Sequence, residues 1–153
     1  MSLDTQQQAA LEYLRTITTK EETGFEHVYI DPADSYPAKP CLVLEDGDDG
    51  MRDERLGGGG DNVYWSLQIS GFCARGDLSS AHAACRSMRA RLVDVWGRKE
   101  HITLGGNCSR CYWEGGVALV SVPGSFETEP EYIGFQGLLT IVFSIERNFP
   151  NSD

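Results

Sequence analysis

The pattern of apolar and polar residues predicts a helix close to the start of the chain. Thr5 and Gln8 stand at the spacing of a capping box, which is a common way for a helix to begin. After them, apolar residues recur at three- and four-residue intervals on one face: Ala10, Leu11, Leu14 and Ile17. The polar stretch from Thr18 to Gly24 interrupts this spacing, so we expect a turn to follow the helix.

Two short strands and a long acidic segment are expected next. His27 to Ile30 and Cys41 to Leu44 have the composition of short strands, and the prolines between them favour an irregular, extended connection. The segment from Glu45 to Asp61, EDGDDGMRDERLGGGGD, is rich in acidic residues and glycine and carries few apolar side chains. Because such a composition buries too little surface to offset the entropy lost on ordering, we expect a flexible loop here.

The middle of the chain carries the clearest periodic patterns. Strict alternation of apolar and polar residues from Asn62 to Cys73 predicts a half-buried strand. A helix of about 19 residues should follow, with Asp77 or Ser79 as its N-cap and Gly97 at its end. The expected buried face of this helix consists of Leu78, Ala81, Cys85, Met88, Leu92 and Val95.

The last third of the chain is expected to form a meander of strands. Candidate strands run from Ile102 to Leu104, from Val117 to Val122 and from Tyr132 to Arg147. The apolar residues of the last one share a face: Ile133, Phe135, Leu139, Ile141, Phe143 and Ile145. Together the elements predict an α+β fold, in which a largely antiparallel or mixed sheet is covered on one face by one long helix and a short N-terminal helix. The length of 153 residues fits a single domain over residues 1–153.

Charge and composition exclude several function classes. The formal net charge of −10 repels phosphate backbones, so we expect no sequence-specific nucleic-acid partner. No apolar run approaches the roughly 18 residues of a membrane span, and the N-terminus has no features of a signal peptide. One short stretch is basic, either as a solvated helix face or as a local basic surface. Its members are Arg86, Arg89, Arg91, Arg98 and Lys99.

The five cysteines bear on redox setting and on metal binding. Their odd number argues against a fully paired disulfide framework and favours a reducing, cytoplasmic setting. Cys108 and Cys111 form a CxxC motif, whose thiols have the spacing of two metal ligands or of a redox pair. A zinc site needs four ligands, and the others would have to come from His82, His101, Cys73 or Cys85. We therefore expect no metal, cofactor or catalytic residue, and keep a small metal- or redox-active protein using Cys108 and Cys111 as the alternative.

The acidic segment admits two interpretations. It is either a solvated insert without a function of its own, or an interaction segment that becomes ordered on a basic partner surface. For the second interpretation the partner-binding residues are Glu45, Asp46, Asp48, Asp49, Asp53 and Glu54. Asp46, Asp48 and Asp49 also offer oxygen ligands for a divalent cation, but the spacing of an EF-hand loop is not met.

The order of these elements resembles that of the tail terminator and tail-completion proteins of long-tailed bacteriophages. The resemblance lies in VYWSLQISGFCARGDLSSAHAACRSMRARLVDVWG, a strand that passes directly into an amphipathic helix, and in the closing EYIGFQGLLTIVFSIER, a long last strand. It extends over residues 5–147 and rests on arrangement more than on an invariant motif. The cysteine content and the CxxC motif depart from the family pattern.

The resemblance implies a mechanical function. Such proteins have no catalytic residues and form closed rings, typically hexamers, that cap the tail tube and present a surface for joining the head. The implied partners are further copies of the chain and tail-tube or head-completion proteins, without a membrane. The implied location is the virion tail or neck, after assembly in the host cytoplasm.

Overall fold

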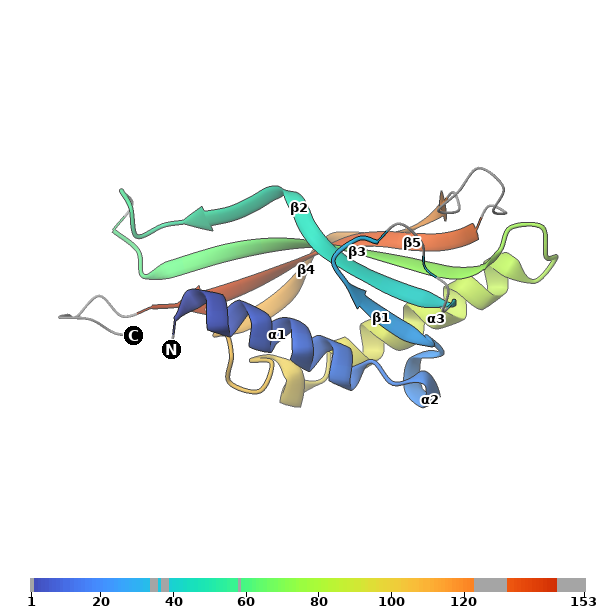
Figure 1. Cartoon of the computed structure of the whole chain (residues 1–153), viewed down its shortest axis with the longest axis horizontal. Coiled ribbons are helices and arrows are strands. Elements are labelled where there is room, and N and C mark those ends of the chain that lie inside the picture. Colours follow the sequence, from blue (N-terminus) through green and yellow to red (C-terminus); the bar gives the residue numbers. More distant parts are fainter. Residues whose placement is uncertain (1, 34–35, 37–38, 58, 123–131, 146–153) are drawn as a thin grey trace.

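The computed structural model describes residues 2–33, 36, 39–57, 59–122 and 132–145, with the side chains of 120–122 left out. The helices are α1 (Leu3–Ile17), α2 (Lys20–Thr23), α3 (Ala81–Trp96) and the 3₁₀ turn η1 (Lys99–His101). The strands are β1 (His27–Ile30), β2 (Cys41–Asp53), β3 (Asn62–Arg75), β4 (Arg110–Val122) and β5 (Tyr132–Ser144). Both long helices lie on one side of a single sheet, which confirms the expected α+β fold (Figure 1).

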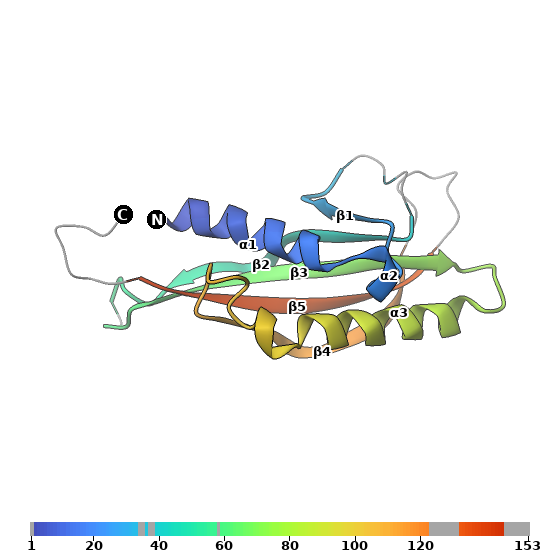
Figure 2. The same ribbon diagram turned by 90° about the horizontal axis from the view of Figure 1, so that it is seen from below.

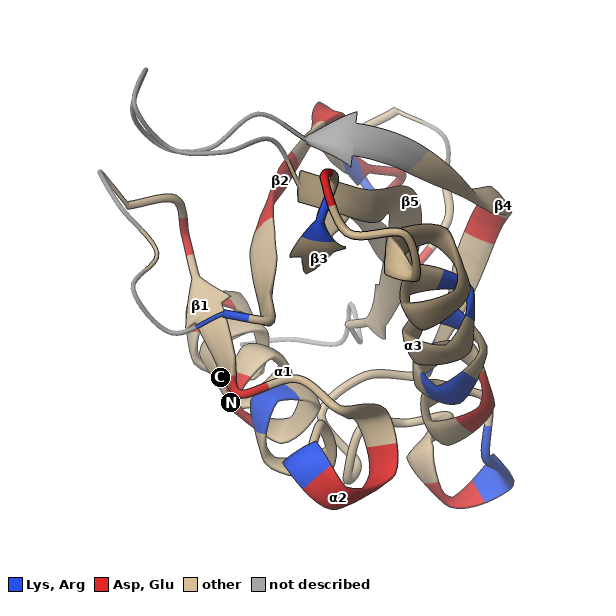
Figure 3. Cartoon of the chain, turned by 90° about the vertical axis from the view of Figure 1, so that its right-hand side faces the viewer, with Lys and Arg blue, Asp and Glu red and all other residues tan. Residues whose placement is uncertain are grey.

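The five strands form a mixed sheet in the order β1-β2-β3-β5-β4. β1 is parallel to β2, and the other neighbours are antiparallel. β1 pairs only with the segment Cys41–Leu44, so the second half of β2 is a sheet edge, and β4 is the opposite edge. Figure 3 shows the sheet curving over the helices, which leaves its other face without a helical cover.

The core lies between the sheet and the two long helices. The alternating residues of β3 and β5 point into it as expected, and Ile69, Phe135 and Phe143 are fully buried. α1 contributes the buried residues of its predicted stripe, Ala10, Leu11 and Leu14. The helices lie beneath the sheet, with α1 nearer β2 and α3 nearer β5 (Figure 2), and one continuous apolar cluster joins α1, α3, β3 and β5. Within the described ranges, no helix is both long and apolar enough to cross a membrane.

The helix starts differ from the expected caps. α1 begins one turn earlier than the capping-box prediction, because the Ser2 hydroxyl accepts a hydrogen bond from the backbone N–H of Thr5 at 3.3 Å. The predicted turn after it contains the short α2, capped by the Thr19 hydroxyl at 3.3 Å from the N–H of Glu22. Gly24 ends α2 in the left-handed region at φ 88°, a conformation that glycine adopts without strain.

The long helix is shorter at its start than the sequence predicts. Its N-cap is Ser80, so Asp77 and Ser79 are not the cap. The Asp77 carboxylate instead accepts a hydrogen bond from Arg75 at 2.8 Å. Leu78 precedes the helix and is 52% exposed, which corrects its assignment to the buried face. The other five residues assigned to that face are buried.

The acidic segment is not a loop over its first half. β2 continues through it to Asp53, and Met51, Arg52 and Asp53 pair with β3 after an irregularity that begins at Asp46. Backbone hydrogen bonds hold this pairing, and few of its side chains are buried. The spacing of apolar residues in the sequence therefore does not predict this part of β2. The connection to β3 is confined to 54–61.

The strands near the C-terminus also differ from the prediction. Ile102–Leu104 is not a strand but part of the turns that follow η1, with Leu104 at a positive φ of 47°. β4 begins at Arg110, well before the predicted Val117. The predicted long last strand is confirmed as β5 from Tyr132 to Ser144. The strand ends before Ile145, one residue into its expected extension, and residues 146–147 and the predicted turn at 123–124 lie outside the described residues.

Candidate functional site

Away from a small apolar cluster of Cys41, Val43 and Phe72, the face of the sheet opposite the helices carries the polar residues that alternate with the core. Gln68 of β3 and Gln136 of β5 line a pocket of about 420 Å³ on this face. Three carboxylates share that pocket: Asp48 and Asp49 from β2 and Glu114 from β4. The pocket therefore favours positively charged groups over anions.

Two irregularities, one in each edge strand, bring these carboxylates together. The register of β2 shifts after Asp46, and that of β4 shifts after Glu114. The two shifts begin at adjacent rows of the sheet, because Glu114 lies in the row of Leu138 and Gln68, whereas Asp46 pairs with the preceding residue of β3, Leu67. Sequence analysis missed Glu114, although the glycines that follow it mark an irregular strand.

The six predicted partner-binding residues differ in their contacts and in their exposure to solvent. Asp46 accepts a hydrogen bond from the Trp65 indole at 2.5 Å, and Asp53 holds Arg55 at 2.8 and 2.9 Å. These two carboxylates are therefore engaged within the chain. Asp48 and Asp49 are exposed at the pocket. The remaining members, Glu45 and Glu54, are partly buried.

The CxxC thiols lie in contact at the start of β4. Cys108 and Cys111 are hydrogen-bonded to each other, and their sulfurs lie 3.9 and 4.0 Å from the carbonyl oxygens of Ile102 and His101. The thiol–thiol hydrogen bond, with burial second, raises the pKa of Cys108. The same bond stabilises the Cys111 thiolate and lowers the pKa of Cys111. All five cysteines are free.

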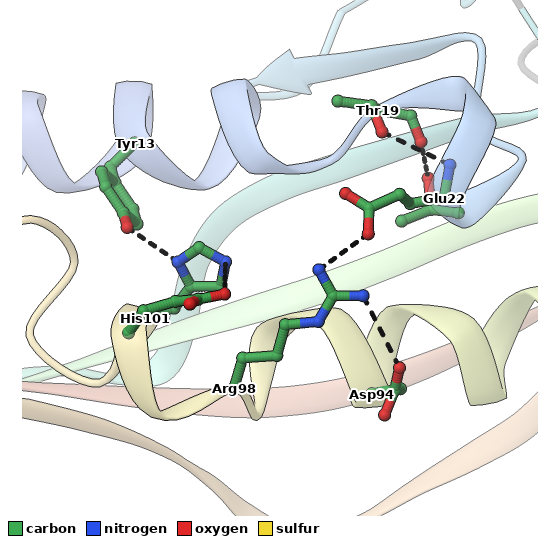
Figure 4. Close-up of polar contacts among 8 residues, drawn as sticks. Tyr13, Thr19, Glu22, Asp94, Arg98 and His101 are labelled. Carbon is green, nitrogen blue, oxygen red and sulfur yellow. Dashed lines mark hydrogen bonds and ion pairs between the residues drawn. The ribbon is translucent and has the colours of Figure 1, made fainter.

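The other predicted zinc ligands are held elsewhere. The His101 ring accepts or donates a hydrogen bond with the Tyr13 hydroxyl at 2.7 Å (Figure 4). Cys73 and Cys85 form a second contacting thiol pair in the core, where burial raises the pKa of both. His82 is exposed on α3. Among the described residues, no three His, Cys, Asp or Glu side chains stand close enough together to hold a metal ion.

The predicted basic stretch divides between two environments. Arg98 pairs with Glu22 at 2.7 Å and with Asp94 at 3.8 Å, which joins α2 to the end of α3 (Figure 4). Arg86 and Arg89 instead lie on the outer side of α3, at the spacing of neighbouring helical turns. The Arg89 guanidinium donates to the carbonyl oxygen of Val117 in β4 at 3.0 Å.

A groove separates α3 from β4 beside these arginines. Its volume is about 370 Å³, and its lining includes Arg89, Val93 and Trp113. The Trp113 ring stacks on Trp96 with centroids 5.5 Å apart and an angle of 10° between the planes, which fixes one wall of the groove.

No protein-family model matches this chain, and no curated protein matches its sequence.

Proposed function

We propose that this chain is a non-enzymatic structural protein of a long-tailed bacteriophage or prophage. In this proposal, copies of the chain assemble into a ring that caps the tail tube or joins it to the head. Support comes from the elements on which the family resemblance rests: a short N-terminal helix, β3 passing into the amphipathic α3, and the long β5.

The observation that carries the proposal is the pair of unlike sheet edges. The second half of β2 and the whole of β4 each offer backbone groups that no described strand pairs on the outer side. The β2 edge is acidic, and the β4 edge lies beside Arg89 of α3, which donates a hydrogen bond to Val117. Since the two edges differ, a contact between them would be heterologous, which is the kind of contact that builds rings.

The uncovered face offers a second contact surface. Asp48, Asp49 and Glu114 share a pocket there with Gln68 and Gln136, which alternate with the core residues of β3 and β5. A ring built through the edges keeps this face accessible, so a basic surface of a tail-tube or head-completion protein could bind it. Such a contact would give the ring its place in a larger assembly.

Electron microscopy of the purified protein in negative stain tests the proposal. We expect closed particles with a central opening and about six copies, as cyclic symmetry allows. Particles no larger than one chain at every protein concentration would contradict it.

A second candidate function follows from the contact between the Cys108 and Cys111 thiols. Two adjacent sulfurs, one of which has a lowered pKa, suit a soft metal ion or a redox couple. Metal analysis of protein purified without chelators distinguishes this candidate. A structural zinc ion would approach about one per chain and would disappear in the Cys108→Ser and Cys111→Ser variants.

A further inference from the structure

The groove between α3 and β4 is apolar inside and positively charged along its helical side. Val93, which is 37% exposed, and Trp113 supply the apolar surface. Arg89 lies in the lining, and Arg86 lies one turn further toward the start of α3 and is exposed. A partner for this groove should therefore combine an apolar side chain with negative charge.

The β2–β3 hairpin has the matching chemistry. Between Glu45 and Asp61, seven carboxylates stand against two arginines, so this segment holds half of the formal net charge of −10. Leu56, in the connection between the strands, is 79% exposed. Among the described residues it is the most exposed large apolar side chain, and Glu54 and Asp61 lie on either side of it in the sequence.

The hairpin and the groove lie far apart on one molecule. The hairpin connection projects at the left end in Figures 1 and 2, whereas α3 occupies the right half. β3 and β5 also separate β2 from β4 in the sheet. A chain therefore cannot place its own hairpin in its own groove, and the hairpin that meets the groove has to come from a second copy.

We propose that the β2–β3 hairpin of one copy docks into the α3–β4 groove of the next copy. Leu56 then packs against Val93 and Trp113, and the hairpin carboxylates lie beside Arg86 and Arg89. This inference rests on the proposed self-assembly and names the two surfaces that produce it. Because each copy has one hairpin and one groove, the contact repeats head to tail, and it forms a ring when the rotation between neighbouring copies closes.

A mixing experiment with two variants tests the docking. Leu56→Asp damages only the hairpin, and Val93→Asp damages only the groove. Each variant alone should have the mass of a single chain in light scattering. An equimolar mixture should form a dimer of one copy of each and grow no further, because only one intact hairpin and one intact groove remain to meet.

A matched control comes from Leu78→Asp, since Leu78 is 52% exposed and belongs to neither surface. This variant should assemble as the wild type does, and all three variants should keep the wild-type thermal unfolding midpoint. If the wild type assembles and the Leu56 and Val93 variants do too, the docking is wrong and the proposed function stands. A mixture that stays monomeric also overturns the docking, and a monomeric wild type overturns both.

Discussion

At the scale of single residues, one buried hydrogen-bond chain joins the two long helices. The Trp96 indole N–H donates to the Thr18 hydroxyl at 3.0 Å, and that hydroxyl donates to the carbonyl oxygen of Leu14 at 2.6 Å. Thr18 is only 7% exposed and Trp96 only 6%, so water cannot replace either partner. The sequence predicts Thr18 merely as the start of a polar turn, because its partner lies 78 residues away.

Replacing Thr18 by Val should destabilise the fold. The substitution keeps the volume but leaves the buried indole N–H of Trp96 without its acceptor, which costs about 1–3 kcal/mol in the free energy of unfolding. Urea unfolding measures the change. Thr16→Val is the control, because Thr16 is exposed and bonds only to its own helix, and it should change the free energy by less than about 0.5 kcal/mol. Equal effects of the two substitutions would contradict the account.

The cysteines should differ in their rate of alkylation. The lowered pKa of Cys111 increases its thiolate fraction near neutral pH, whereas burial raises the pKa of Cys41 to about 12. In the native protein, iodoacetamide should therefore modify Cys111 first, and its reaction should reach a plateau at a lower pH than that of Cys41. Peptide mass spectrometry across a pH series measures both rates. Modification of Cys41 as early as Cys111 would show that burial does not protect it.

At the scale of elements, the success of the sequence analysis depends on what holds each element. β3 and β5 are confirmed because their side chains alternate between core and solvent. The apolar faces of α1 and, apart from Leu78, of α3 are confirmed because apolar residues recur at three- and four-residue spacing. The second half of β2 was missed because it is held by pairing with β3, by the bond from Trp65 to Asp46 and by Arg52 over the Tyr64 ring at 4.6 Å. None of these contacts produces an apolar period.

The same reason limits the prediction of the candidate site. Composition alone indicated the acidic residues of β2. Glu114 reaches the same pocket only because of the register in which β4 pairs with β5, and an amino-acid sequence does not state that register. The pairing of Val93 with Trp113 in one groove likewise depends on how α3 crosses β4. Residues brought together by tertiary packing therefore had no local signal.

Gly47 tests the role of the irregularity in β2. A methyl group at this position would meet the Ser66 hydroxyl at 2.7 Å and Leu138 at 3.2 Å, so Gly47→Ala should displace both side chains from their present positions. We expect a loss of about 1–3 kcal/mol in the free energy of unfolding, as for other overpacked sites.

Gly116→Ala is the matched control for this substitution in β4. A methyl group there meets no atom within 4 Å, so the substitution should leave the free energy of unfolding nearly unchanged. Chemical denaturation of both variants gives the comparison. Equal stability of the two would mean that β2 does not need the close approach at Gly47.

At the scale of the whole molecule, charge and open backbone edges are distributed unevenly. The acidic edge of β2 and the groove beside β4, which Arg89 lines, lie toward opposite edges of one sheet. Attraction between such surfaces is weakened by salt, since the Debye length falls from about 10 Å at 0.1 M to about 3 Å at 1 M. Assembly through them should therefore be strongest at low ionic strength.

The measurement that tests self-assembly most directly is the mass of the wild-type protein in solution, determined by light scattering over a wide concentration range at low salt. The account predicts a plateau at one fixed multiple of the 16.9 kDa chain, because a closed ring stops growing when its last contact forms. A mass of 16.9 kDa at every concentration, or growth without a plateau, would contradict it.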